Sequence, residues 1–168
     1  ARPRKPLIVF TPKQLLRLRA AQSSVEDFTK GTFRTVIAEQ EKQVRDNAAN
    51  VERVLLCSGR LYYDLAAERL KRKDDKVAII RIEQLYPLDQ WSVAQALKPY
   101  QNAELLWVQD EPANQGPWTF VSDHLESETL GGRELRLVSR AAAASPSTGL
   151  AKIHKVQAGE LLGAAFDR

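Results

Sequence analysis

The chain has 168 residues, of which 43% are hydrophobic and 27% charged, and its formal net charge is +4. This length suits one globular domain with a sizeable core. No apolar run approaches the roughly 20 residues that cross a bilayer, no signal peptide precedes the first predicted strand, and a single cysteine excludes an internal disulfide. We therefore expect a soluble, cytoplasmic protein without a membrane anchor.

Positive charge gathers at the front of the chain. Residues 1–50 contain ten Lys or Arg against five Asp or Glu, whereas residues 51–168 contain fifteen against sixteen. Such a segment would suit a nucleic-acid adaptor if it formed one face, but no aromatic residues alternate with the basic ones and no known binding module is present. That function is kept as an alternative only. The absence of methionine further indicates that Ala1 is a processed or truncated end of something longer.

The first 52 residues show little sustained periodicity. A short strand is predicted over Leu7–Phe10, followed by one or two helical turns over 12–18. Residues 19–52 mix turn-forming residues with a charged run, which predicts a linker with one short helix. The chain is accordingly divided into residues 1–18, a linker over 19–52, and a regular domain over 53–168.

From residue 53 onward, strands and helices alternate. The apolar spacing predicts strands over 53–57, 77–82, 104–109 and 135–139, and helices over 61–72, 89–100, 117–128 and 153–166. Alternation of this kind predicts an α/β domain with three layers, in which a mostly parallel sheet is flanked by helices on both faces.

A polar stretch between Trp107 and Trp118 follows the third of these strands. It contains Gln109, Asp110, Glu111, Asn114 and Gln115, and it lies where a strand passes into a helix. In open α/β sheets, ligands gather at this carboxyl edge. The alternative is that Asn114 and Gln115 only cap the helix and satisfy backbone groups of the loop.

Residues with catalytic potential are sparse. Ser58-Gly59-Arg60 follows a strand, as phosphate loops do, but it lacks the Gly-x-Gly-x-x-Gly and Walker spacings, so a tight turn is the simpler interpretation. Cys57 looks like a buried strand residue, and neither histidine has metal-ligand spacing. We assign no catalytic, cofactor-binding or metal-binding residue. The residues alone indicate an interaction or regulatory domain, with a stand-alone phosphate- or nucleotide-binding domain as an alternative.

Six segments occur in an order that is far more specific than any single short motif. They are Lys5–Arg17, Gly31–Phe33, Cys57–Leu65, Arg81–Pro87, Gln109–Trp118 and Ala144–Gly149. Together they resemble the thiamine diphosphate-dependent decarboxylase component of 2-oxoglutarate dehydrogenase, and the resemblance covers essentially the whole chain. It is nearest to the bacterial enzymes, including those in which an acyltransferase domain is fused in front.

The resemblance implies a transketolase-like carboxyl-terminal domain over 53–168, and it places residues 1–18 at the end of a preceding pyrimidine-binding-type domain. The parent enzyme would be an oxidoreductase of the tricarboxylic acid cycle that decarboxylates 2-oxoglutarate with thiamine diphosphate and magnesium. It would then pass the succinyl group to a lipoyl arm. The family's Gly-Asp-Gly motif and active-site histidines are absent here. Both cofactors should therefore bind to domains outside this chain, and the segment alone should be inactive.

The resemblance also implies partners for this segment. They are the remaining domains of the enzyme, a second subunit of a homodimer and the lipoyl-bearing acyltransferase component, but no nucleic acid and no membrane. On this basis Glu111, Asn114 and Gln115 are candidates for an interdomain or subunit contact. Arg17 and Arg60 are candidate contacts for an anionic effector.

Overall fold

Strand β2 lies at the centre of a five-stranded sheet in the computed structural model, which describes residues 4–6 and 8–168. The strand order is β1-β3-β2-β4-β5, and every pairing is parallel except that of β1 with β3. This arrangement confirms the α/β class and the mostly parallel sheet. The strands are β1 (Val36–Ile37), β2 (Arg53–Cys57), β3 (Val77–Ile82), β4 (Glu104–Pro112) and β5 (Leu135–Arg140).

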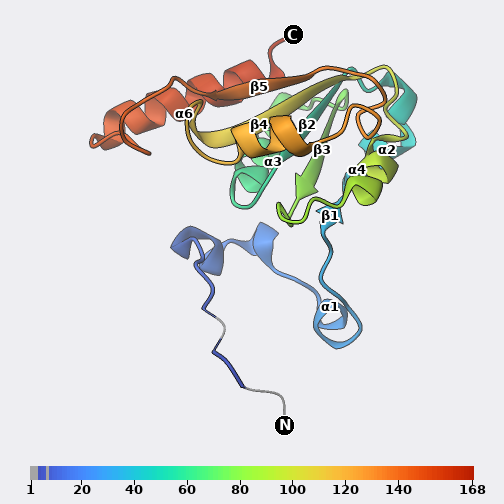
Figure 1. Ribbon diagram of the computed structural model, residues 1–168, viewed down its shortest axis with the longest axis horizontal. Coiled ribbons are helices and arrows are strands. Elements are labelled where there is room, and N and C mark those ends of the chain that lie inside the picture. The colour runs from blue at the N-terminus through green and yellow to red at the C-terminus, as the bar shows by residue number, and fades with distance from the viewer. Residues whose placement is uncertain (1–3, 7) are drawn as a thin grey trace. The chain divides into compact units, whose positions relative to one another are not determined.

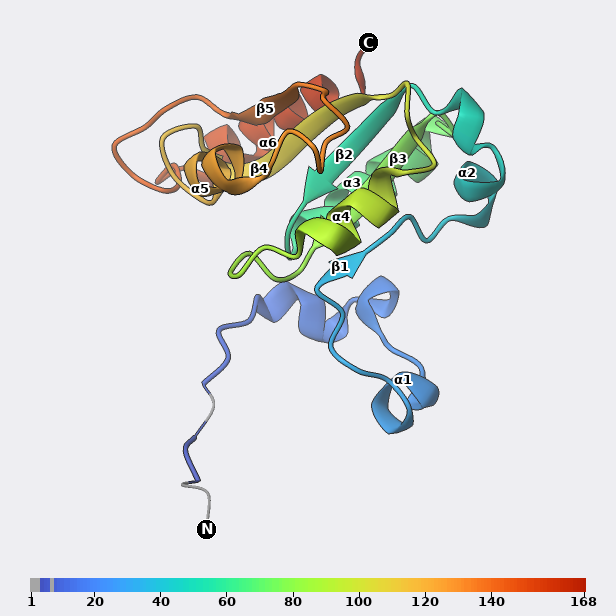
Figure 2. The same ribbon diagram turned by 45° about the vertical axis from the view of Figure 1, so that its right-hand side comes forward.

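Helices cover both faces of the sheet because both faces are apolar. Along β2, Val54 and Leu56 point to one hydrophobic cluster and Leu55 and Cys57 to the other, as the alternation of a strand requires. Figure 2 shows α4 and α5 on the near side of the sheet, with α3 and α6 behind it. The helices are α2 (Lys42–Asp46), α4 (Gln90–Leu97) and α5 (Trp118–His124) on the first face, and α3 (Leu61–Arg72) and α6 (Ala151–Phe166) on the second.

Local signals fix several of these boundaries. The Asp89 carboxylate accepts a hydrogen bond from the Ser92 amide at 2.9 Å and caps α4, as its sequence predicted. At the other end of a helix, Lys73 adopts a left-handed conformation (φ 55°) and stops α3.

Two elements near the polar stretch differ from their predicted lengths. Strand β4 continues to Pro112 because its last residues still pair with β5, where Pro112 lies opposite Arg140. Helix α5 ends at His124 rather than near residue 128, because Leu125 and Leu130 are both buried and the chain must fold back between them. Gly131 and Gly132, both with positive φ, complete that reversal.

Residues 33–52 contribute to the sheet unit. The contacts divide the chain after Thr32, so that residues 33–168 form one compact unit. Strand β1 pairs with the end of β3, and Val44 of α2 is buried in the core. The sheet unit thus begins earlier than the linker expected over 19–52 would suggest, because a two-residue strand and a five-residue helix are too short to show a period.

Among the described residues of the unit formed by residues 1–32, the regular elements are short helices, and no residue is buried. They are the 3-10 helices η1 (Lys13–Arg17) and η2 (Arg19–Ala21) and the α-helix α1 (Val25–Thr29). The helical turns predicted over 12–18 are present as η1. Of the strand predicted over 7–10, Leu7 lies outside the described residues, and residues 8–10 form no strand. A strand needs a neighbour to pair with, and none lies beside these residues within their own unit.

In the parts of the chain that the structure describes, no helix has the length and apolar character needed to cross a membrane.

Candidate functional site

The polar stretch lies at the carboxyl edge of the sheet, where its sequence predicted. The regular pairing of β4 with β5 is interrupted between Val108 and Pro112. This irregularity lets Gln109, Asp110 and Glu111 depart from simple alternation, and each side chain has a different environment.

Gln109 organises the stretch from within. Its side chain is buried, and its Oε1 accepts hydrogen bonds from Trp107 Nε1 at 3.1 Å and from the Trp118 amide at 3.0 Å. Its Nε2 donates to the carbonyls of Gln115 at 2.7 Å and Pro112 at 3.1 Å. One amide thereby joins β4, the loop and the first residue of α5. Its hydrogen bonds are all used internally, so Gln109 holds the loop in shape.

Asp110 is held between two arginines from different elements. Its carboxylate contacts Arg60, just before α3, at 2.5 Å and Arg140, at the end of β5, at 2.7 Å. Burial alone would raise the pKa of Asp110, but the hydrogen bonds from Arg140 and Arg60 lower it below its ordinary value. Arg60 also contacts Asp64 at 2.5 Å. Asp110 therefore links the carboxyl ends of β2, β4 and β5.

The other polar residues of the loop hold a second loop. Asn114 exchanges two hydrogen bonds with Ala143, both at 3.0 Å, and Gln115 Nε2 donates to the same Ala143 carbonyl at 3.0 Å. Glu111 by contrast is exposed and has no hydrogen bond or ion pair through its carboxylate within the described residues. Of the three residues predicted to make a contact, two are thus committed to the loop over 141–149, and Glu111 faces solvent.

Gly116 lets these loops approach closely. It has a φ of +69°, and a Cβ there would lie 2.9 Å from Glu111 Cβ. Any other residue would be strained on both counts.

A hollow of about 340 Å³ lies between α3 and α6, and it reaches the same edge of the sheet. Leu61, Leu161 and Leu162 form much of its apolar lining, while Arg60 and Asp110 stand at its rim. Arg60 was a predicted anion contact, but its guanidinium is balanced here by two carboxylates. An anion would have to displace one of them. Arg17, the other predicted contact, is exposed in the unit formed by residues 1–32.

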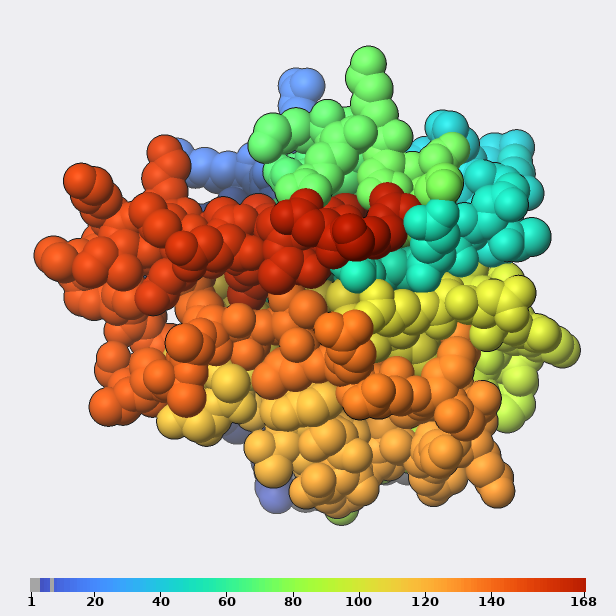
Figure 3. Space-filling view, turned by 90° about the horizontal axis from the view of Figure 1, so that it is seen from above, coloured from blue at the N-terminus to red at the C-terminus, as the bar shows by residue number. Residues whose placement is uncertain are grey.

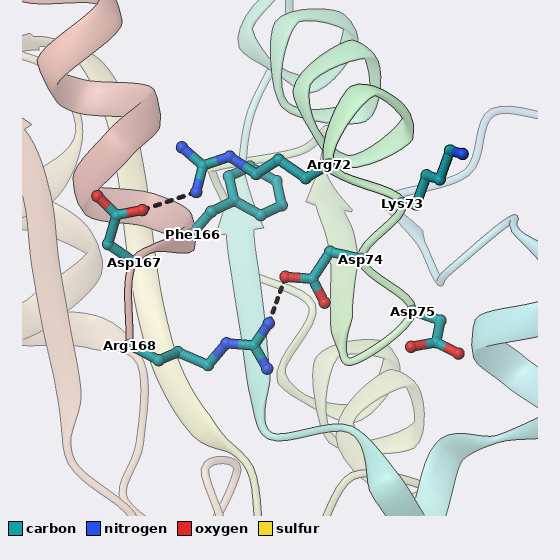
Figure 4. Close-up of a pocket in the computed structure, with 7 residues that line it drawn as sticks. All are labelled: Arg72, Lys73, Asp74, Asp75, Phe166, Asp167 and Arg168. Atoms are coloured by element: carbon teal, nitrogen blue, oxygen red, sulfur yellow. Dashed lines mark hydrogen bonds and ion pairs between the residues drawn. The ribbon is translucent and has the colours of Figure 1, made fainter.

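A larger hollow, of about 720 Å³, lies at the opposite edge (Figure 4). Arg72 contacts Asp167 at 2.6 Å across it, and Arg168 pairs with Asp74. Arg168 also contacts Glu52 at 2.5 Å, so the end of the chain is held against the segments just before β2 and β3. Figure 3 shows the dark red end of the chain beside green and teal residues. Four of the hollow's charged residues are paired across it, whereas Lys73 and Asp75 make no ion pair within the described residues. Ligands favour the other edge of such sheets, so we interpret this hollow as part of a structural contact that holds the end of the chain.

Neither the cysteine thiol nor the potential metal ligands form a reactive site within the described residues. Burial raises the pKa of Cys57 to about 12, so the thiol is protonated at neutral pH. Within the described residues, no group of three or more His, Cys, Asp or Glu side chains is placed to hold a metal ion.

The model of the 2-oxoglutarate dehydrogenase C-terminal family matches residues 22–166. The chain belongs to this family. Two similar relatives are the 2-oxoglutarate dehydrogenase E1 component of Cupriavidus necator, 46% identical over 97% of this chain, and the E1/E2 component of Corynebacterium glutamicum, 46% identical over 98%. A third is the multifunctional 2-oxoglutarate metabolism enzyme of Mycobacterium sp. strain JLS, 45% identical over 96%.

The chain spans 17% of the first relative's length and 13% of each of the other two. As a member of the 2-oxoglutarate dehydrogenase C-terminal family, it therefore corresponds to a small part of each of these longer proteins. The resemblance stated from the sequence is thereby confirmed. The arginine partners of Asp110 were not foreseen together, because Arg60 and Arg140 are 80 residues apart in the chain and only the fold brings them to one carboxylate.

Proposed function

We propose that this chain is the carboxyl-terminal domain of a thiamine diphosphate-dependent 2-oxoglutarate dehydrogenase in the cytoplasm. The parent enzyme decarboxylates 2-oxoglutarate and passes the succinyl group to the lipoyl arm of an acyltransferase component. Family membership, together with the small share of each relative that the chain covers, carries this proposal. It is better supported than a stand-alone nucleotide-binding domain or a nucleic-acid adaptor.

The segment itself has a structural role in this proposal. Its described residues offer no three-ligand metal cluster, and the polar groups of Gln109 and Asp110 are used in holding the carboxyl edge together. In this proposal thiamine diphosphate and magnesium bind to domains of the parent enzyme outside this chain. When bound, the thiamine ring supplies the electron sink for decarboxylation.

An activity assay tests whether catalysis requires the domains outside this chain. The purified 168-residue chain, mixed with 2-oxoglutarate, thiamine diphosphate and Mg²⁺, should release no carbon dioxide above the rate without protein. The full-length protein, assayed alongside with a lipoyl acceptor, should release it. Turnover by the chain alone would contradict the structural role, and an inactive full-length protein would contradict the enzyme assignment.

The loops at the carboxyl edge form the proposed contact with another domain or with the second subunit of a homodimer. Glu111 is exposed, and Asn114 and Gln115 fix the neighbouring loop through Ala143. Labelling of Glu111 by a carbodiimide and an amine should therefore be slower in the full-length protein than in the isolated chain. Equal labelling in the two would contradict the contact.

Residues 1–18 are proposed to complete the preceding domain. Large apolar side chains in this segment are open to solvent, with Phe10 96%, Ile8 76% and Leu16 73% exposed. Apolar surface of this extent is normally covered by another part of the protein. The linker expected over 19–52 then follows, and its last part, residues 33–52, already belongs to the sheet unit.

Arg17 and Arg60 remain proposed anion contacts for an effector. A phosphate that binds Arg60 would have to displace the carboxylate of Asp110, whereas one that binds the exposed Arg17 displaces no ion pair within the described residues. Calorimetric titration of the full-length protein with inorganic phosphate should show weaker binding in R17A and R60A than in the wild type. Unchanged binding in both variants would remove these residues from any effector site.

A further inference from the structure

Arg81 lies against two tyrosines at the carboxyl end of β3. Its Cζ is 4.5 Å from the ring centroid of Tyr62 and 5.6 Å from that of Tyr63. The two rings meet edge to face at 5.1 Å. The Arg81 side chain is only 18% exposed, so the guanidinium is held in place by the first turn of α3.

Most donors of this guanidinium have no acceptor. Arg81 Nε donates to Glu83 Oε1 at 2.9 Å, but Nη1 and Nη2 make no hydrogen bond within the described residues. The hydroxyls of Tyr62 and Tyr63 make none there either. These groups are open to water, since no fully buried side-chain polar atom lacks a partner in the described chain.

The other arginines of low exposure behave differently. Arg53 donates to Glu104 and to the carbonyls of Ala165 and Asp167. Arg69 and Arg140 likewise use both nitrogens of the fork on acceptors inside the chain. Arg81 is ordered by stacking but keeps its fork unused.

A guanidinium group with two free terminal nitrogens, placed beside two phenol groups, is suited to binding a carboxylate. Two parallel N–H groups suit the two oxygens of a carboxylate, and tyrosine and arginine are the residue types that dominate binding energy at protein contacts. Arg81 lines neither of the two hollows described above. The relatives show how much polypeptide is available outside this chain, since this chain is 13–17% of their length.

We propose that Arg81, with Tyr62 and Tyr63, binds the carboxylate of an Asp or Glu from polypeptide outside residues 1–168. This inference rests on the proposed function, because it needs the other domains or the second subunit of the parent enzyme. It adds a defined anchor to the contact at the carboxyl edge of the sheet.

Zero-length cross-linking of the full-length protein tests the carboxylate directly. R81K keeps the charge and places a primary amine at this position, and a carbodiimide-activated carboxyl in contact with that amine forms an amide and releases a urea. We expect mass spectrometry to find this amide joined to an acidic residue outside residues 1–168. Finding it only with a residue of this chain, or not at all, would overturn the inference.

R45K is the matched control. Arg45 lies on α2, is exposed and makes no ion pair within the described residues, so its replacement should give no specific cross-link. Phenylglyoxal labelling of the unmodified protein gives a second measurement that needs no variant. Arg81 should react several-fold more slowly in the full-length protein than in the isolated chain, whereas Arg45 should react equally in both.

The Glu111 labelling described above separates the two ideas. If Glu111 is protected but neither the cross-link nor the protection of Arg81 is found, the carboxylate anchor is overturned and the proposed loop contact stands. If the cross-link is found but Glu111 is labelled equally in both proteins, only the proposed loop contact is contradicted. If the cross-link joins two subunits, R81A should also weaken their association about tenfold or more in a dissociation assay, since truncating one member of a desolvated charge pair removes its hydrogen bonds.

Discussion

At the scale of single residues, the carboxyl edge depends on side chains that satisfy backbone groups. Gln109 accepts from Trp107 and Trp118 and donates to two carbonyls, while its own side chain is 3% exposed. Buried polar groups that lose their partners keep the cost of desolvation. The shape of the polar loop therefore rests on one amide.

Replacing that amide should be costly. We expect Q109L to lower the free energy of unfolding by about 2–4 kcal/mol, because the Trp118 amide and two carbonyls lose a buried partner. Urea unfolding of the isolated chain measures this. Q101L is the control, since Gln101 is exposed and makes no hydrogen bond through its side chain. Equal stability of the two variants would show that the loop does not need Gln109.

Asp110 makes the stability of this edge depend on pH. Its pKa is lowered in the folded chain, because the hydrogen bonds from Arg140 and Arg60 outweigh the effect of burial. A lowered folded pKa adds stability that is fully present above the unfolded value near 3.8 and is lost as the pH falls through the folded value. D110N should thus be less stable than the wild type at pH 7, by about 1–3 kcal/mol.

The difference between D110N and the wild type should shrink as the pH is lowered from 5 toward 2. Chemical unfolding at several pH values measures it. D123N provides the control, because Asp123 is exposed and pairs with no arginine or lysine in the described chain. A difference that is independent of pH would contradict the charged role of Asp110.

At the scale of elements, a buried ion pair joins the segment before β2 to the sheet. Arg69 of α3 donates to both oxygens of Glu39, at 2.6 and 3.0 Å, and the Ile79 amide of β3 donates to the same carboxylate at 2.6 Å. Strand β1 reaches only the last two residues of β3. Glu39 thus occupies part of the β3 edge that no strand covers.

Removing the carboxylate should leave Arg69 charged and buried. We expect E39A to cost about 3–5 kcal/mol, whereas the double variant E39M/R69M costs much less because neither charge remains. E41A, at an exposed neighbour, should change the free energy of unfolding by less than about 0.5 kcal/mol. If E39A unfolds with the same midpoint as E41A in guanidinium chloride, the pair does not anchor this segment.

At the scale of the whole molecule, the chain consists of two units with unequal cores. Residues 33–168 hold both hydrophobic clusters, and no described residue of the unit over 1–32 is buried. Apolar burial is the main source of stability, so the sheet unit should carry nearly all of it.

Two truncations test where the stable unit begins. A chain beginning at Phe33 should match the 168-residue chain within about 0.5 kcal/mol. A chain beginning at Arg53 loses β1, Val44, Val51 and the partner of Arg69, so we expect it to lose more than about 5 kcal/mol. Thermal and urea unfolding of the three chains compare them. Equal stability of the two truncated chains would place the boundary at residue 53 instead.

Much of the fold could be predicted because its signals are local and repeated. The strands over 53–57 and 77–82 have the predicted bounds, and Asp89 caps its helix. Strand β1 and the burial of Glu39 could not be predicted, since two residues show no period and a lone glutamate looks exposed. The sequence placed the polar stretch correctly at the edge, but not the internal role of Gln109.

By itself, the sequence determined the family, the α/β class and the order of the elements after residue 53, since apolar periodicity, caps and ordered motifs are properties of neighbouring residues. Only the tertiary structure decided which charges meet. Arg60, Asp110 and Arg140 converge because parallel strands bring their carboxyl ends together. Arg81 stacks on Tyr62, and its two terminal nitrogens have no acceptor among the residues that the structure describes. Long-range pairings depend on crossovers and register, which no local pattern encodes.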